Sequence, residues 1–503
     1  MDSNKQIKLG AIISYIALFI NILVTLLYTP WMVQTIGKEN YGLYTLATSL
    51  ISLFLLDFGL SSSVARFVAK YQAEGNTDKQ ENFVAAVSRL YLLIDFILAI
   101  IFVIIFLFID NIYVGLTDHE VAMFKILYII VAGVNLLSFP ATPFTGYLNA
   151  YEQFAPLKIC ELVNKVLTVV LVVILLFMDG NVISVVCANA IVSVLVVILK
   201  YIVVRKQTNI RIHFKVTDKS IYHEIFAFSI WTLCISLAQR ILINATPSVL
   251  GMTSSSAEIA LFSPALSLEE YYYSIAVAIN GLFLPTISRL LAKNEENKIL
   301  PLMIKVGRYQ TCVLGLVLIG FFCIGKDFMF LWMGKDFVGS YYCAIFMMIP
   351  QFFSSSQQIG YTSITAKGYV NYQAIVNLLT ALVGVCLSYW WSLSYGAVGS
   401  CAAIFLMNMI NVIGVDVILV KKFHIKISLF YKNCYLKMGI PIVLTASVGY
   451  YICNVLISHA NFWGLCVKSA IVVGIYSLLM WIIAFDKEEK SFVLRIMEWI
   501  KKR

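Results

Sequence analysis

Charged side chains are scarce in this 503-residue chain, where Asp, Glu, Lys and Arg together make up 13% of the residues. Soluble domains typically carry about 25% charged residues. Hydrophobic residues make up 60% of the chain and fall in long runs separated by short loops. Because a helix that crosses a bilayer takes about 20 apolar residues, we expect an integral membrane protein that acts within or across the membrane.

Motifs for metal binding and catalysis are lacking as well. The eleven cysteines form no C-x-x-C pair and lie almost wholly inside the apolar runs, and the five histidines show no ligand spacing. There is also no H-E-x-x-H motif, no phosphate-binding glycine loop and no Ser/His cluster. We therefore predict no metal, no cofactor and no catalytic residue, which disfavours a membrane enzyme.

The apolar runs predict an all-α membrane protein with about fourteen transmembrane helices, read with a window of about 19 residues. The predicted spans are residues 10–31, 41–64, 84–109, 122–147, 157–178, 182–204, 226–250, 259–284, 310–331, 341–361, 374–393, 397–420, 438–457 and 465–485.

Basic residues indicate the orientation of these spans. With a cytoplasmic N-terminus, most Lys and Arg residues fall in inner loops and in the C-terminal tail, so both termini are predicted to be cytoplasmic. The few basic residues on the outer side are Lys38, Lys125, Lys326, Lys335 and Lys468. The net charge of +10 is then explained by topology and by anionic membrane lipid, and it does not indicate nucleic-acid binding.

A weak internal repeat relates two halves of the chain. Thr29-Pro30 ends the first predicted helix, and Thr246-Pro247 lies near the end of the seventh. The second helix ends in Ala-Arg-Phe-Val-Ala-Lys at 65–70, and the eighth in Ser-Arg-Leu-Leu-Ala-Lys at 288–293. Parallel repeats of this kind imply a pseudo-two-fold axis along the membrane normal with a cavity between the two lobes.

The repeat also predicts how the chain is divided. We expect an N-terminal six-helix lobe at 1–204, a basic cytoplasmic linker at 205–225 and a C-terminal six-helix lobe at 226–420. Two additional helices and a basic cytoplasmic tail make up 421–503.

Several segments resemble those of a known family. Tyr28-Thr29-Pro30-Trp31 and Tyr41-Gly42-Leu43-Tyr44, followed by Leu56-Asp57-Phe58-Gly59-Leu60 and Arg66, resemble the opening of bacterial polysaccharide flippases. These are the Wzx-type O-antigen and capsule-unit transporters of the multidrug/oligosaccharidyl-lipid/polysaccharide superfamily. Leu284-Pro285 with Ser288-Arg289 looks like their eighth helix.

The resemblance implies a MATE-like fold in the bacterial inner membrane that works by alternating access. The cargo would be an undecaprenyl-pyrophosphate-linked oligosaccharide, moved from the inner to the outer leaflet, with H⁺ or Na⁺ as a coupling ion and polysaccharide polymerase machinery as a partner. The alternatives are a multidrug, cation-coupled exporter and a flippase of another lipid-linked cell-wall precursor. Many relatives carry an acid in the seventh helix near Thr246-Pro247, where this chain has none, and Glu269 and Glu270 are candidates to replace it.

Charged residues inside a membrane are costly, so those in the predicted spans are candidates for a functional site. Arg240 lies at about the same depth as Glu269 and Glu270 on the next helix, if each residue rises 1.5 Å. The three residues form either a structural ion pair or a cavity site for pyrophosphate or sugar. Further candidate substrate-binding residues nearby are Gln239, Asn244 and Tyr273.

The other charged residues in the predicted spans are candidates either for gating and ion coupling or for structural pairs. Asp57 and Arg66 form either a gate between the lobes or a helix-end pair, and Asp95 either couples an ion or has a structural partner. We expect Glu161 to pair with Lys165 at i,i+4. We also expect Asp416 to pair at its helix end with Lys421 or Lys422.

Overall fold

The computed structural model describes residues 3–55, 60–178, 180–208, 210–211, 214, 234–280, 283–293, 295–457 and 461–501. Across these ranges the chain forms helices joined by short turns, and none of the described residues lies in a strand. The predicted all-α fold is therefore confirmed.

The chain packs as two compact units, which we describe one at a time. The first contains Met1–Ser263 and Asn377–Ser400, and the second contains Pro264–Val376 and Cys401–Arg503. Two long helices, α11 (Ser256–Asn280) and α16 (Val370–Phe423), contribute residues to both units. The two-lobe division at 1–204 and 226–420 stays a prediction, and most of the predicted linker at 205–225 lies outside the described residues.

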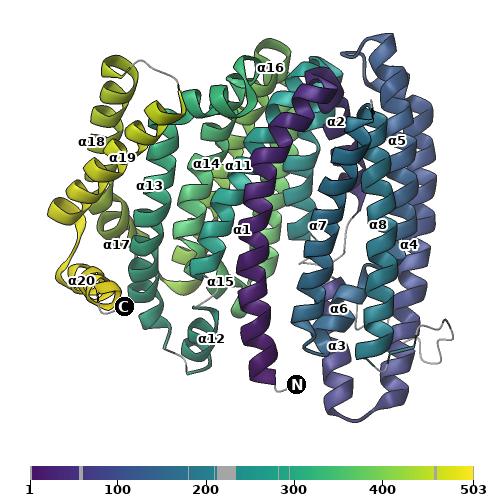
Figure 1. The fold of residues 1–503 in the computed structure, drawn as a ribbon. Coiled ribbons are helices and arrows are strands. Elements are labelled where there is room, and N and C mark those ends of the chain that lie inside the picture. Colours follow the sequence, from purple (N-terminus) through teal and green to yellow (C-terminus); the bar gives the residue numbers. More distant parts are fainter. Residues whose placement is uncertain are drawn as a thin grey trace. The chain divides into compact units, whose positions relative to one another are not determined.

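The first unit is held together largely by helices that are distant in the sequence. In it α7 packs against both α1 and α8, while α5 packs against α2, α4 and α8 (Figure 1). Its elements are α1 (Ser3–Ile36), α2 (Lys38–Phe54), α3 (Leu60–Ala73), α4 (Thr77–Ile112), α5 (Asp118–Ser138), η1 (Phe139–Ala141), α6 (Pro143–Ala150), α7 (Phe154–Phe177), α8 (Val182–Gln207) and α10 (Thr246–Thr253).

Helix α4 shows which face of a helix in this unit contacts lipid. Phe96, Val103 and Leu107 follow one face at helical spacing and are 68%, 60% and 67% exposed. The opposite face buries Tyr91 and Phe102 inside the unit. An apolar stripe of this size costs free energy in water and is stabilised by lipid chains. The exposed face of α4 is therefore the face that contacts the bilayer.

Helix α2 approaches the start of α11 so closely that only glycine fits between them. A Cβ atom on Gly42 would lie 1.9 Å from the carbonyl oxygen of Ser256. Nearby, Tyr41 Oη and Ser263 Oγ are 2.7 Å apart and share a hydrogen bond. The segment Tyr41-Gly42 therefore fixes the entry of α11 against the first unit.

The second unit is organised around α13, which packs against α14, α15, α18 and α19 (Figure 1). Its other elements are α12 (Leu284–Ala292), η2 (Glu296–Lys298), α13 (Ile299–Met333), η3 (Lys335–Phe337), α14 (Gly339–Ser356), α15 (Gln358–Ala366), α17 (Ile427–Tyr431), η4 (Lys432–Leu436), α18 (Lys437–Tyr451), η5 (Ile452–Leu456), α19 (Phe462–Leu479), η6 (Met480–Ala484) and α20 (Lys487–Lys501).

Helix α16 contains two predicted spans joined by a kink. Gly396 has φ 53° and ψ −134°, a conformation open to glycine and strained for other residues. The carboxylate of Glu258 accepts a hydrogen bond of 2.8 Å from the backbone N–H of Ala397. Glu258 thereby satisfies one of the N–H groups left without a helical partner at the start of the second half.

Nine helices within the described residues are long and apolar enough to cross a membrane, and a tenth span results if the bent pair Ile20–Ile36 and Lys38–Phe54 counts as one. The expected number of fourteen is not confirmed. Part of the predicted span at 226–250 lies outside the described residues. The two spans predicted at 374–393 and 397–420 form the single element α16.

Candidate functional site

Arg240 lies in the helical segment 234–244 of the first unit and is partly buried. Its Nη1 donates a 2.7 Å hydrogen bond to the backbone carbonyl of Ser52 in the last turn of α2. Carbonyls in a last turn have no partner within the helix, and a cation there also interacts favourably with the helix dipole. Arg240 therefore caps α2. Its predicted partners Glu269 and Glu270 belong to the second unit, so that pairing stays a prediction.

The two polar neighbours of Arg240 differ in exposure. Gln239 is exposed and Asn244 is partly buried, and Asn244 follows Arg240 by one helical turn. Amide side chains can both donate to and accept from sugar hydroxyl groups. This segment therefore offers a guanidinium and two amides within a single turn and a half of helix.

Helix α11 carries the two candidate glutamates in its middle. Glu269 is partly buried and Glu270 is exposed, and within the described part of the second unit neither side chain forms an ion pair. Tyr272 is buried and donates a 3.2 Å hydrogen bond to the carbonyl of Leu314 in α13, whereas Tyr273 is 43% exposed. Tyr272 thus contributes to packing between α11 and α13. Tyr273 lies one turn from Glu269 and its ring is accessible.

The three candidate gating residues are found in different settings. Asp57 lies outside the described residues, and Arg66 is exposed on α3. Asp95 is partly buried in α4, and its Oδ1 has no hydrogen-bond partner among the described residues. Tyr91 and Leu98, which are buried, flank it on the same helical face. A carboxylate oxygen left without a partner at such a position is a functional-site candidate.

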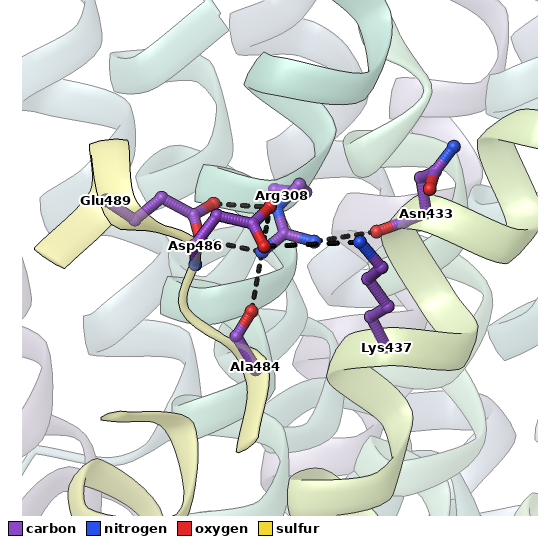
Figure 2. A network of polar contacts seen from close by, with 6 residues as sticks. All are labelled: Arg308, Asn433, Lys437, Ala484, Asp486 and Glu489. Carbon is purple, nitrogen blue, oxygen red and sulfur yellow. Dashed lines mark hydrogen bonds and ion pairs between the residues drawn. The ribbon is translucent and has the colours of Figure 1, made fainter. Parts of the chain in front are cut away.

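The structure also reveals a polar network centred on Arg308 of α13, shown in Figure 2. Its guanidinium binds the carboxylate of Glu489 through two hydrogen bonds of 2.7 and 2.6 Å. It also donates to the backbone carbonyls of Asn433 at 2.8 Å and Ala484 at 2.7 Å. The Arg308 side chain is 6% exposed and that of Glu489 is 12% exposed. The sequence around Arg308 gave no sign of this network, because its partners lie at least 125 residues further along the chain.

A second buried ion pair joins α13 to α19. The Lys468 ammonium contacts the carboxylate of Asp327, and the Lys468 side chain is 2% exposed. The sequence placed Lys468 among the outer basic residues but did not identify its partner. Long-range pairs of this kind leave no signal in the local spacing of charges. The Arg308 and Lys468 pairs hold helices together, and neither is part of the predicted substrate site.

With the fold and these residues described, comparisons with known proteins can be stated. A family model described as "Polysaccharide biosynthesis protein" matches residues 7–291. The chain belongs to this family. Among curated protein sequences, no match is found.

Solved structures with a similar fold are described as a flippase and as transporters. The chain is similar to "Lipid II flippase MurJ, inward closed conformation", with TM-score 0.72, 15% identity, and coverage of 94% of this chain and 98% of that chain. It is also similar to a multidrug resistance MATE family transporter of the MOP superfamily in an inward-facing conformation (TM-score 0.68, 14% identity, 84% and 99% coverage). A Vibrio cholerae MATE transporter gives TM-score 0.56 at 13% identity, with 84% and 99% coverage. The predicted MATE-like fold is therefore confirmed, and the chain is a multi-pass membrane protein.

Proposed function

We propose that this protein is a flippase that moves an undecaprenyl-pyrophosphate-linked oligosaccharide from the inner to the outer leaflet of the bacterial cytoplasmic membrane. The observation that carries the proposal is the match to the polysaccharide biosynthesis family over residues 7–291. A fold shared with a lipid II flippase supports it, because that fold is compatible with a lipid-linked cargo. In this proposal the chain works by alternating access, has both termini in the cytoplasm and catalyses no covalent reaction.

The chemistry of the cargo suggests roles for the candidate residues. A pyrophosphate is a doubly charged anion that suits a guanidinium fork. In the proposal Arg240 binds this group, while Gln239 and Asn244 bind sugar hydroxyls. Tyr273 offers an accessible ring for a sugar face. Glu269 and Glu270 modulate the affinity of Arg240 for the cargo, or accept hydrogen bonds from sugar hydroxyls.

In the proposal, Asp95 couples transport to an ion, and Asp57 and Arg66 form a gate. Asp95, with one carboxylate oxygen lacking a partner in the described residues, is proposed to bind the coupling ion, H⁺ or Na⁺. Asp57 and Arg66 are proposed to gate the cavity from the cytoplasmic side. Polysaccharide polymerase machinery would receive the flipped unit.

The test is to measure surface glycan and membrane protein level in cells that carry Arg240 variants. Arg240→Ala should abolish glycan export at a normal protein level. Arg240→Lys keeps a donor for the Ser52 carbonyl but lacks the fork, and should therefore keep the protein level with only part of the export. Arg205→Ala is the matched control, because Arg205 is an exposed arginine at the end of α8.

Three other outcomes would count against this role. Normal export by Arg240→Ala would exclude cargo binding by Arg240. Loss of protein in both Arg240 variants, restored by Glu269→Gln or Glu270→Gln, would identify a structural ion pair. Normal glycan export in a strain that lacks the whole protein, together with drug sensitivity, would favour the multidrug exporter.

A further inference from the structure

The last helix, α20, is fastened to the second unit at its first turn. Glu489, the third residue of α20, is held by two hydrogen bonds from Arg308 (Figure 2). Asp486, just before the helix, lies 3.4 Å from the same guanidinium. A second contact joins Glu488 to Lys305 at 4.0 Å. The start of α20 is therefore fixed relative to α13.

The residues just before α20 indicate the membrane level at which it begins. The candidate span Phe462–Ala484 ends three residues before Lys487. The ring of Trp481 packs on Phe485 at 6.4 Å, and the ammonium of Lys490 lies 5.7 Å from the same Trp481 ring. Tryptophan beside a basic residue is typical of the lipid–water interface. This arrangement places the first turn of α20 at the headgroup level.

From this anchor α20 runs crosswise to α13 below α19 (Figure 1). It makes no extensive packing contact with another helix in the described part of the chain. A helix that follows a span and lies across its direction runs along the membrane surface. Its remaining turns therefore meet lipid or water, and the sequence of α20 decides between them.

The sequence of α20 is strongly amphipathic. At helical spacing, five apolar positions of the sequence fall on the side of α20 that carries Glu489, the residue bound to Arg308. These apolar positions are Phe492, Val493, Ile496, Met497 and Ile500. The opposite face carries more basic than acidic residues, with the acids Glu488 and Glu498, and it also holds the exposed Leu494. The basic positions of α20 and of the two residues after it are Lys487, Lys490, Arg495, Lys501, Lys502 and Arg503.

We infer that α20 is an in-plane membrane helix that binds anionic phospholipid headgroups on the cytoplasmic surface of the bilayer. Its apolar face enters the acyl boundary, and its basic face meets the headgroup phosphates. Helices with these two faces bind membranes by buried apolar area plus attraction to anionic lipid. The Arg308 contact sets the depth of the helix and neutralises the acid, Glu489, on its apolar face. This inference does not depend on the identity of the cargo.

Hydrogen exchange of the full-length protein in nanodiscs tests the inference. The discs contain either phosphatidylcholine alone or phosphatidylcholine with phosphatidylglycerol. The amides of residues 490–500 should exchange more slowly with phosphatidylglycerol, by roughly tenfold, because several basic residues gain interaction with an anionic surface. Exchange in α13 should be the same in both lipids, which checks that the fold is unchanged.

Two variants and one control separate the two faces. Lys487→Gln with Arg495→Gln and Lys501→Gln should remove the difference between the lipids. Ile496→Ser should speed exchange of α20 in both. The control replaces Lys79, Arg205 and Lys206 with Gln, since these are exposed basic residues of the first unit, and should leave α20 unchanged.

The outcomes that overturn the inference are equally defined. Equal protection of α20 in both lipids would show that it is held by protein or by apolar contacts alone. Fast exchange in both would show a helix in water. A lipid difference that survives the triple Gln variant would mean that the basic face is not the binding surface.

Discussion

At the scale of single residues, Arg308 carries the largest expected effect on stability. Removing one partner of a buried ion pair leaves a desolvated charge and costs about 3–5 kcal/mol. Arg308→Ala should therefore lower the apparent Tm of the detergent-solubilised protein strongly, because Glu489 then stays 12% exposed without its partner. Lys305→Ala is the control, since its pair with Glu488 is exposed and contributes about 0–1 kcal/mol.

An equally low Tm for Lys305→Ala would contradict this account of Arg308. The variant Arg308→Lys gives a further check. A lysine cannot reach two carboxylate oxygens and two backbone carbonyls at once in the geometry of a guanidinium. It should therefore recover only part of the lost stability, and full recovery would show that the charge alone matters.

The pair between Lys468 and Asp327 leads to a second residue-scale prediction. Asp327→Leu alone leaves the Lys468 ammonium, which is 2% exposed, without its carboxylate. The double variant Asp327→Leu, Lys468→Met should be more stable than the single one, because an apolar pair avoids the desolvation cost. Thermal unfolding of both variants measures this. A double variant no more stable than the single one would show that the unpaired Lys468 ammonium costs little.

Single residues were also where sequence reasoning failed most clearly. The expected pair of Glu161 with Lys165 is wrong, since Glu161 pairs with Lys158 at 2.8 Å and Lys165 donates to Thr25 Oγ1 of α1 at 3.3 Å. Local spacing offered two basic partners for one acid, and only the neighbouring helix decided between them.

The expected partner of Asp416 is also wrong. Its carboxylate accepts a 2.6 Å hydrogen bond from Tyr431, while the ammonium of Lys422 lies 4.4 Å from the Tyr372 ring. Flexible lysines at helix ends meet aromatic faces as readily as acids. A partner that arrives from another helix, such as Tyr431 of α17, is not visible in the sequence around Asp416.

At the scale of elements, the kink in α16 depends on one glycine. Gly396→Ala should lower stability by about 1–3 kcal/mol, the usual cost of a strained backbone position. The new Cβ would also lie 2.3 Å from Glu258 Oε2, displacing the carboxylate that caps Ala397. Gly320→Ala in α13 is the matched control, because nothing lies within 4 Å of its added Cβ. Comparing the Tm of the two variants tests this, and equal values would mean that α16 tolerates a straight helix.

Elements were predicted well where the apolar run was continuous and poorly where it was interrupted. The runs at 84–109, 157–178 and 182–204 became α4, α7 and α8, since each needs a full bilayer-spanning length of helix. The end of the first half of α16 and the start of its second half depend on a contact from Glu258, far away in the chain. The amphipathic α20 has no apolar run of spanning length, so a hydropathy window does not detect it.

At the scale of the whole molecule, basic-residue asymmetry makes a topology prediction. Cysteines placed at Lys215 and Lys432 should react only with reagents that reach the cytoplasm, and one at Lys335 should react from outside. Labelling in intact cells of variants that each carry one of these added cysteines measures this. The exposed native residues Cys386 and Cys466 must first be replaced. Labelling of positions 215 and 335 from the same side would contradict the predicted orientation.

Two buried ion pairs of α13, Arg308 with Glu489 and Lys468 with Asp327, have a consequence for motion. Arg308 and Asp327 are separated by about 28 Å along the helix at 1.5 Å per residue, close to the thickness of a bilayer core. The Arg308 pair holds the start of α20 against α13, and the Asp327 pair holds α19 against it. Helix α13 is therefore joined to the C-terminal helices toward both of its ends. A helix that is held at two distant points cannot tilt or slide relative to the helices that hold it. In the proposed transport cycle α13, α19 and the first turn of α20 should therefore move together as one rigid group, with the hinge elsewhere in the chain.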